Sequence, residues 1–244
     1  MQPTDDDGQH WARVAAEWVA WARTPNHDAF WSYRAALAAF LRPGTGAALD
    51  LGCGEGRVSR ELTALGYHVI AFDPVGELLA AAAEARSASH YVRADAAALP
   101  FRDAYFDLVV AYNVLMDVPD VPAVVTEMRR VLRPTGRAII SIVHPFADRG
   151  RFADSTPDAP FVVRGSYFGR ERFEGVEQRG GLRMHFAGWS QPVEDYAEAL
   201  SDAGFAITGL REPVPDLSIG GEHLRHGTRM PFFLWLEVRP FPPG

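Results

Sequence analysis

The chain has 244 residues, of which 48% are hydrophobic and 23% charged, and it carries a formal net charge of -7. This composition is typical of a globular protein, and the length allows one large α/β domain with a buried core. All 24 basic residues are arginine, which excludes Schiff-base chemistry and a P-loop lysine because both need a side-chain amine. The negative balance argues against nucleic acid as a substrate, since such binding depends on clustered cations.

The N-terminal sequence and the hydropathy pattern indicate where the protein acts. Residues 1–7 are acidic where a signal peptide would be basic and then apolar, and no run of 18 uncharged apolar residues occurs. We therefore expect a cytoplasmic protein with no membrane partner. The single cysteine, Cys53, excludes an internal disulfide, and we expect it to be a small buried residue rather than a nucleophile.

Two helices are predicted before the first strand. Apolar residues recur at helical spacing over residues 9–23 and again over about 28–41. The stretch 42–46 contains proline and glycine, which end the second helix and lead into a strand. We predict that residues 1–42 form a helical cap.

A glycine-interrupted turn follows the first predicted strand, residues 47–51. Gly52, Gly54 and Gly56 stand at alternate positions before the start of a helix. Glycines there let the chain turn tightly and let a ligand approach main-chain N–H groups. We predict that a ligand lies across this turn.

Two residues in and after the turn argue against a dinucleotide as that ligand. The dinucleotide fingerprint needs a third glycine where Arg57 stands. Glu55 would also repel a phosphate at the helix N-terminus. A nicotinamide oxidoreductase is therefore disfavoured but stays open as an alternative.

Two acids follow the next two predicted strands. Asp73 ends the run 67–72, and its place about 20 residues past the glycines suits an acceptor for both hydroxyls of a ribose. Asp95 follows the run 90–94 in the same way. Both acids are expected at the carboxyl ends of parallel strands, where ligands of such sheets bind.

Strands and helices continue to alternate, which predicts parallel pairing and a doubly wound sheet. The remaining elements of this part are helices from residue 58, over 76–86 and over 120–132, and strands over 106–112 and 136–143.

The alternation stops over residues 145–190. The segment has seven arginines and six acids, and it is too rich in aromatic residues for disorder: Phe146, Phe152, Phe161, Tyr167, Phe168, Phe173, Phe186 and Trp189. We predict a cover over the substrate, and its aromatic, nearly neutral composition favours an apolar or aromatic small molecule.

The C-terminal part is predicted to complete the sheet. A helix over 191–205 precedes strands over 206–211 and 232–238, with a loop at 220–227 between the strands. His223 and His226 would supply only half of a metal site, so we predict a solvated loop and no metal.

The form D-x-G-x-G-x-G at residues 50–56, with the acids at positions 73 and 95, resembles the motifs of class I S-adenosylmethionine (SAM) dependent methyltransferases of the type 11 kind. The resemblance extends over about residues 47–144. It implies a Rossmann-like sheet of seven strands, the seventh antiparallel, within a single domain over 1–244. The implied parts are the N-terminal cap, a cofactor-binding core (43–144), the cover (145–190) and a C-terminal part (191–244).

The resemblance also implies the cofactor and the residues that hold it. The cofactor is S-adenosyl-L-methionine and the product S-adenosyl-L-homocysteine, with Asp95 accepting from the adenine amino group and the next main-chain N–H meeting the ring. In related enzymes the preceding helices close over the cofactor, which brings Tyr33 or Arg34 towards its carboxylate. The implied cofactor site contains Asp50, Gly52, Cys53, Gly54, Gly56, Arg57, Asp73, Pro74, Asp95, Ala96, Tyr112 and Asn113.

Methyl transfer is an in-line displacement, so the protein mainly has to place the acceptor and exclude water. His144, just beyond the fifth strand, is the first candidate for a general base, and the alternative interpretation is that it caps the turn before Pro145. Tyr167 and His185 are further candidates; where the family often has histidine the chain has Asp117. The predicted substrate-binding residues are Tyr33, Met116, Phe146, Tyr167, Phe186 and Trp189.

The predicted partner is therefore a small-molecule methyl acceptor that is methylated on O, N or C, and the predicted assembly is a monomer or homodimer. A protein of the same fold that binds the cofactor without transferring a methyl group is the second alternative, because the turn and the two acids predict binding and not turnover.

Overall fold

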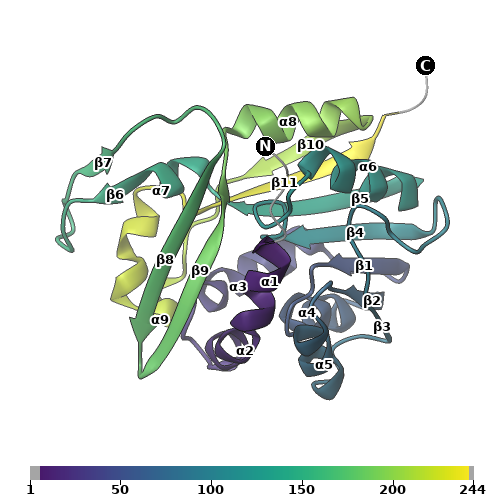
Figure 1. Cartoon of the computed structure of the whole chain (residues 1–244), viewed down its shortest axis with the longest axis horizontal. Helices are drawn as coiled ribbons and strands as arrows, with labels where there is room; N and C mark the ends of the chain where they lie inside the picture. Colours follow the sequence, from purple (N-terminus) through teal and green to yellow (C-terminus); the bar gives the residue numbers. More distant parts are fainter. Residues whose placement is uncertain (1–5, 242–244) are drawn as a thin grey trace.

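A seven-stranded sheet forms the centre of the molecule in the computed structural model, which describes residues 6–241 (Figure 1). From one edge to the other its strands are β10 (Phe205–Arg211), β11 (Phe233–Pro240), β5 (Leu132–Val143), β4 (Phe106–Tyr112), β1 (Ala47–Leu51), β2 (His68–Phe72) and β3 (His90–Val92). The five strands from β1 to β5 pair in parallel, whereas β11 is antiparallel to both β5 and β10. The predicted doubly wound sheet with an antiparallel seventh strand is confirmed.

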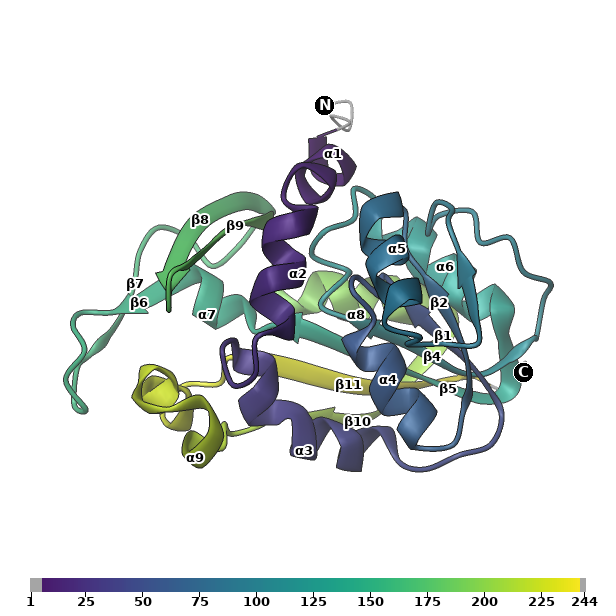
Figure 2. The ribbon, with the colours of Figure 1, turned by 90° about the horizontal axis from the view of Figure 1, so that it is seen from below.

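Helices cover both faces of this sheet. One face carries α6 (Val121–Val131) and α8 (Val193–Asp202), and the other carries α3 (Ala29–Leu41), α4 (Arg57–Ala64) and α5 (Gly76–Glu84), as Figures 1 and 2 show. The burial of both faces explains the unbroken apolar run of the central strand β4. Val109 and Ala111 face the core under α6, whereas Val110 and Tyr112 face the core under α3.

Local sequence signals determine where α6 begins and which of its faces packs on the sheet. The side chain of Asp120 caps α6 by accepting a hydrogen bond from the backbone N–H of Ala123 at 2.9 Å. Val121, Val124, Val125 and Met128 follow at the i, i+3, i+4 and i+7 spacing and are buried. This face holds α6 on the sheet.

The N-terminal helices lie beyond the carboxyl ends of the parallel strands. Helices α1 (Asp6–Arg13) and α2 (Ala15–Arg23) stand between α5 and a long hairpin made of β8 (Glu171–Arg179) and β9 (Leu182–Ser190), as Figure 2 shows. One side of α2 packs Trp21 against Met184 of the hairpin, and the other packs Ala15 against Leu78 of α5. The cap therefore bridges the sheet domain and the inserted segment.

The inserted segment has more regular structure than its sequence suggests. Residues 145–190, all of which are described, contain α7 (Pro145–Arg149), the short strands β6 (Gly150–Phe152) and β7 (Phe161–Val163), and the β8–β9 hairpin. None of these strands joins the seven-stranded sheet. No helix within residues 6–241 is long and apolar enough to cross a bilayer.

The structure corrects the predicted start of one strand and the predicted conformation of one loop. Strand β5 begins at Leu132 and not at 136, because Leu132 pairs with Phe106 before a register irregularity, after which Arg137 pairs with Leu108. The predicted loop at 220–227 is helical instead, with α9 (Leu217–Gly220) followed by the 3-10 helix η1 (Glu222–Thr228). Within residues 6–241, no three or more His, Cys, Asp or Glu side chains gather in a way that could hold a metal ion; the ring of His226 stacks on that of Phe152, with centroids 3.9 Å apart.

Candidate active site

The glycine turn between β1 and α4 has the backbone that its sequence predicts. Gly52, Gly54 and Gly56 all have positive φ values, 69°, 55° and 89°. A Cβ on Gly52 would lie 2.5 Å from a methyl group of Val114, so only glycine fits there. The turn is tied to the next strand, because the N–H of Cys53 donates to the carbonyl of Phe72 at 2.9 Å.

Asp73 joins the turns that follow β1 and β2. Its carboxylate is buried and accepts two backbone hydrogen bonds, from the N–H of Gly54 and from that of Val75, each at 2.8 Å. Burial raises the pKa of Asp73 to about 6, and the two backbone N–H groups oppose this rise. Since each carboxylate oxygen has two lone pairs, both oxygens can accept a further hydrogen bond from a ligand.

Asp50 lies beneath the turn, where its carboxylate is too buried to accept a hydrogen bond from a ligand. Its side chain is only 1% exposed and accepts a hydrogen bond from the hydroxyl of Ser59 at 2.5 Å. Burial raises the pKa of Asp50 to about 7, the Ser59 hydroxyl lowers it, and the neighbouring acids Asp73 and Glu55 raise it further. Asp50 therefore supports the turn from inside the core.

Asp50→Asn should stabilise the protein at alkaline pH. A raised folded-state pKa makes a carboxyl group's contribution to stability largest below its unfolded pKa, and this contribution is lost as pH rises towards 7. Asparagine keeps the shape and the acceptor for Ser59 but does not ionise. The free energy of unfolding of the variant relative to the parent should rise by about 2–3 kcal/mol between pH 5 and pH 8. Urea unfolding at both pH values measures this, and a constant difference would contradict the assignment.

Cys53 is inert in this environment. Its thiol is buried, donates to the carbonyl of Gly54 at 3.5 Å, and has its pKa raised by burial and by the neighbouring acid Asp50. The expectation of a small buried residue agrees with this geometry.

The residues after β3 form an open edge of the site. Asp95 is exposed, and its carboxylate accepts from the N–H of Ala97 at 2.9 Å, while Ala96 and Leu99 beside it are buried. Pro74, on the neighbouring turn, is exposed and offers its carbonyl to Arg93. Asp95 and Pro74 thus lie on a surface that a flat ligand can reach.

The end of β4 supplies the predicted Tyr112 and Asn113. Asn113 has a positive φ of 55°, and Ser141 of β5 holds it by donating its hydroxyl to the Asn113 side-chain oxygen at 2.7 Å. Tyr112 is buried, and its hydroxyl has no hydrogen-bond partner among the described residues. An unpartnered buried hydroxyl at this edge of the sheet is a candidate ligand contact.

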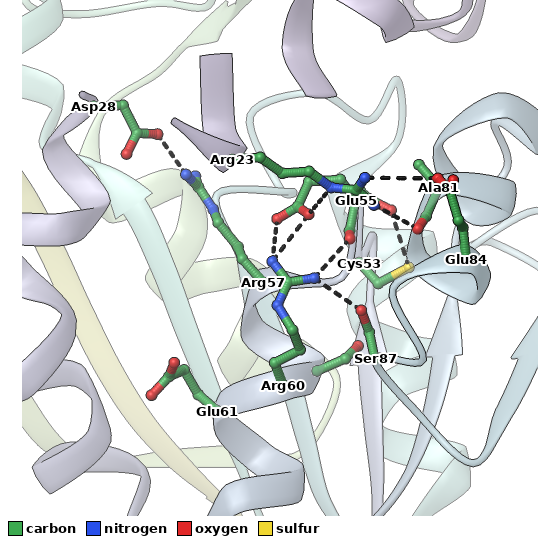
Figure 3. Close-up of polar contacts among 12 residues, drawn as sticks. Arg23, Asp28, Cys53, Glu55, Arg57, Arg60, Glu61, Ala81, Glu84 and Ser87 are labelled. Carbon is green, nitrogen blue, oxygen red and sulfur yellow. Dashed lines mark hydrogen bonds and ion pairs between the residues drawn. The ribbon is translucent and has the colours of Figure 1, made fainter. Parts of the chain in front are cut away.

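Arg57, the first residue of α4, is paired with a residue that sequence reasoning missed. Its guanidinium donates to the carboxylate of Asp28, which precedes α3, and both side chains are almost fully buried (Figure 3). The guanidinium also lies 4.7 Å from the ring centroid of Trp18 and 4.6 Å from that of Phe30. Asp28 belongs to the cap and lies 29 residues before Arg57, so no sequence spacing indicates that the two residues pair.

Glu55 is buried between two arginines. Its carboxylate accepts from Arg23 of α2 at 3.0 Å and from Arg60 of α4 at 2.8 Å and 2.9 Å, as Figure 3 shows. Arg60 also donates to the hydroxyl of Ser87 at 2.8 Å. Contrary to expectation, Glu55 would repel a phosphate only weakly, because Arg23 and Arg60 offset its charge.

The cap closes over the glycine turn through Trp18. A Cβ on Gly54 would lie 3.2 Å from the indole Nε1 of Trp18. Trp18 of the cap therefore lies directly against the glycine turn. One surface hollow of about 770 Å³ lies between α2 and Glu77 of α5, and another of about 430 Å³ lies beside Trp31 of α3.

Both ring nitrogens of His144, the candidate base, are engaged. His144 caps α7, with its Nδ1 accepting from the N–H of Phe146 at 3.3 Å and its Nε2 lying 3.1 Å from a carboxylate oxygen of Glu212. Burial lowers its pKa, and Glu212 opposes this effect. The capping interpretation accounts for the contact of Nδ1, and a role as base stays a prediction.

The other two catalytic candidates lie in different places. The ring of Tyr167 stacks on Phe146 at 4.8 Å, and its hydroxyl accepts from the N–H of Val193 at 3.1 Å. His185 of β9 faces the cap, where its ring lies edge-on to that of His10 at 5.0 Å. The structure therefore joins His144 and Tyr167 through Phe146 but separates them from His185.

The cap residues that were expected near the cofactor have structural partners. Tyr33 is fully buried, and its ring packs edge-on against that of Phe233 of β11 with centroids 5.0 Å apart. Arg34 pairs with Glu61 of α4 at 2.7 Å. The hydroxyl of Tyr33 has no hydrogen-bond partner among the described residues, and contacts of Tyr33 and Arg34 with a ligand stay predictions.

The remaining substrate candidates form two groups. Phe186 of β9 packs edge-on against Trp18 and Trp21 of the cap, at 6.2 Å and 5.9 Å. The carbonyl of Met116 accepts from the N–H of Trp189 at 2.7 Å, so this pair ties the base of the hairpin to the loop after β4. Phe186 and the two tryptophans form an aromatic wall beside the glycine turn.

This fold and this turn define a class I SAM-dependent methyltransferase. A family model described as a methyltransferase domain matches residues 49–140. The chain is 34% identical over 194 residues to a malonyl-[acyl-carrier protein] O-methyltransferase of Erwinia pyrifoliae, and the match covers 78% of this chain and 68% of that protein. The chain belongs to the SAM-dependent methyltransferase family.

Two further similarities agree with this assignment. A protein of the same name from Enterobacter lignolyticus is 32% identical over 187 residues, and the match covers 73% of this chain and 66% of that protein. A solved structure of a SAM-dependent methyltransferase from Mesorhizobium loti matches with a TM-score of 0.67 and 26% identity, over 87% of this chain and 98% of the other. The nicotinamide oxidoreductase and the fold without methyl transfer are thereby superseded as alternatives.

Proposed function

We propose that this enzyme binds SAM across the glycine turn and transfers its methyl group to an O, N or C atom of a small, apolar or aromatic acceptor held beneath the cap. SAM supplies a transferable methyl group on a positively charged sulfur. The observation that carries the proposal is the buried Asp73 carboxylate, which braces Gly54 and keeps lone pairs for two ribose hydroxyls.

The residues around the turn fit this cofactor. Asp95 lies exposed on the next turn, where it can accept from the adenine amino group, and the buried Ala96 and Leu99 make the base of this turn apolar. Gly52 and Gly54 are half-buried, and their lack of a Cβ lets a ligand approach the main chain of the turn.

The chain's own contribution to the reaction is orientation and the exclusion of water. The aromatic wall of Trp18, Trp21 and Phe186 spans α2 and β9 and lies over the turn, so an acceptor placed there is shielded from solvent. We propose residues 145–190 as its outer cover, because the β8–β9 hairpin supplies one side of this wall. The nearly neutral charge of the segment supports an apolar or aromatic acceptor.

The names of the two relatives favour a second candidate acceptor, a malonyl carboxylate carried on an acyl-carrier protein. Such a carboxylate needs no base to remove a proton, which agrees with a site in which both nitrogens of His144 are engaged. The two acceptor classes differ in whether a carrier protein has to dock.

The test combines binding with label transfer. Calorimetry with S-adenosylhomocysteine should show a single site, and incubation with methyl-labelled SAM should move the label to one fraction of a metabolite extract or to a malonyl carrier protein. The same incubation with an Asp73→Ala enzyme is the control and should transfer at most a trace. Absence of binding by the parent protein would contradict the proposal.

A further inference from the structure

The buried pair of Arg57 and Asp28 is costly for a structural contact. The two side chains are only 12% and 10% exposed, and removal of an ion pair from water costs several kcal/mol for each ion. Trp18, Phe30 and Tyr112 surround the guanidinium, with ring centroids 4.7 Å, 4.6 Å and 5.7 Å away, so little water can solvate it. A residue pair of this kind beside a ligand-binding turn calls for a functional explanation.

Two polar atoms beside the pair lack partners. Oδ1 of Asp28 and the hydroxyl of Tyr112 are inaccessible to solvent and have no hydrogen-bond partner among the described residues. Asp28 does not use its side chain to cap α3, although it stands at the N-cap position. Each unpartnered group costs about 1–3 kcal/mol, which a ligand with matching polar groups would recover.

The guanidinium has donors to spare as well. Within residues 6–241, the Arg57 guanidinium donates one hydrogen bond, from Nη1 to Oδ2 of Asp28. Because a guanidinium carries five N–H donors, most of them stay available for a ligand. The place therefore combines spare cationic donors, one spare anionic acceptor and one hydroxyl.

This combination matches a zwitterion better than a simple ion. A lone anion would be attracted by Arg57 but repelled by Asp28. A lone cation would be attracted by Asp28 but repelled by Arg57. An α-amino acid group has a carboxylate and an ammonium on one carbon, so it can satisfy both residues and leaves the net charge of the buried site unchanged. Arg57 directly follows the glycine turn and Tyr112 ends β4, so the pair lies beside the path of a ligand whose ribose contacts Asp73.

We propose that Asp28 and Arg57 together bind the amino acid group of the cofactor, with the ligand carboxylate on the free N–H groups of Arg57 and the ammonium on Oδ1 of Asp28. The Tyr112 hydroxyl is the third polar contact. This inference rests on the proposed function, and it adds a residue of the cap to the cofactor site.

The test compares two ligands that differ only in the amino acid group. S-adenosylhomocysteine contains it, and 5′-methylthioadenosine keeps the nucleoside and sulfur without it. In the parent protein the first should bind more tightly by calorimetry. In Asp28→Asn and in Arg57→Gln this preference should fall by about 10- to 100-fold, while affinity for 5′-methylthioadenosine changes less than about threefold.

A matched control is the Glu61→Gln variant. It removes the charge from the Arg34–Glu61 pair, which also joins α3 to α4 but in which the Arg34 side chain is 49% exposed, and it should leave the preference unchanged. If Arg57→Gln does not fold, the isosteric Asp28→Asn decides alone. Equal weakening of both ligands would mean that the pair is structural, and an unchanged preference would mean that the pair holds something else, such as an amino acid acceptor; either outcome overturns the inference. Failure of the parent protein to bind either ligand would instead contradict the proposed function.

Discussion

Replacement of Asp73 with alanine should weaken the binding of S-adenosylhomocysteine by about 100-fold or more. Hydrogen bonds to a charged group contribute about 1.5–3 kcal/mol, and the variant loses the acceptor for both ribose hydroxyls. It also leaves the N–H groups of Gly54 and Val75 without their acceptor, so the turn that carries the ligand relaxes. Calorimetry of the parent and the variant at pH 8 measures the change.

The same residue should make cofactor affinity depend on pH. The pKa of Asp73 is raised to about 6, and only the ionised carboxylate has lone pairs for every donor around it. Affinity should therefore be constant from pH 8 to about 6 and then fall by up to tenfold for each unit of pH. Asp73→Asn should bind weakly at every pH, without this decline.

Asp107→Ala is the matched control for these measurements. Asp107 also accepts a hydrogen bond from a backbone N–H, that of Ala47 at 2.9 Å, but it lies near the start of β4 at the opposite end of the sheet. Its replacement should affect stability and leave affinity unchanged. Equal affinities for the Asp73→Ala variant and this control would place the ribose elsewhere.

The parts of the fold that local sequence determines were predicted well. Alternating strands and helices, the positive φ of the turn glycines and the acids after β2 and β3 all follow from neighbouring residues, and the sheet order confirms the architecture they imply. Element ends were predicted less well, as at β5 and in the helical stretch before β11, because pairing with distant strands and packing decide them.

The contacts of the candidate site were harder to predict, because they join residues that are far apart in the chain. Arg57 was singled out, but Asp28 was not. Glu55 was expected to repel a phosphate, but its charge is paired with Arg23, which lies 32 residues before it. Glu212 meets His144 across 68 residues. Spacing within one element cannot show that the cap folds back over the turn, so its buried charges went unrecognised.

The buried Glu55 carboxylate, which pairs with Arg23 of the cap, should contribute strongly to the stability of the protein. Glu55→Ala should lower the free energy of unfolding by about 3 kcal/mol and the melting temperature by about 6–12 °C. The Glu55 side chain is completely buried, so its loss leaves two guanidinium groups without their shared partner. Arg23 and Arg60 are 32% and 37% exposed and can regain some water, which keeps the loss near the lower end for a broken buried pair.

Glu84→Ala is the control, because Glu84 also pairs with Arg23 but is 79% exposed and 3.7 Å away. Its loss should change stability by no more than about 0.5 kcal/mol. Because Arg23 belongs to α2 and Glu55 to the turn, Glu55→Ala should also loosen the cap and speed proteolysis within α1 and α2 before the sheet unfolds. Thermal unfolding and limited trypsin digestion of the two variants measure both effects. If Glu55→Ala and Glu84→Ala behave alike, the buried carboxylate does not hold the cap on the glycine turn.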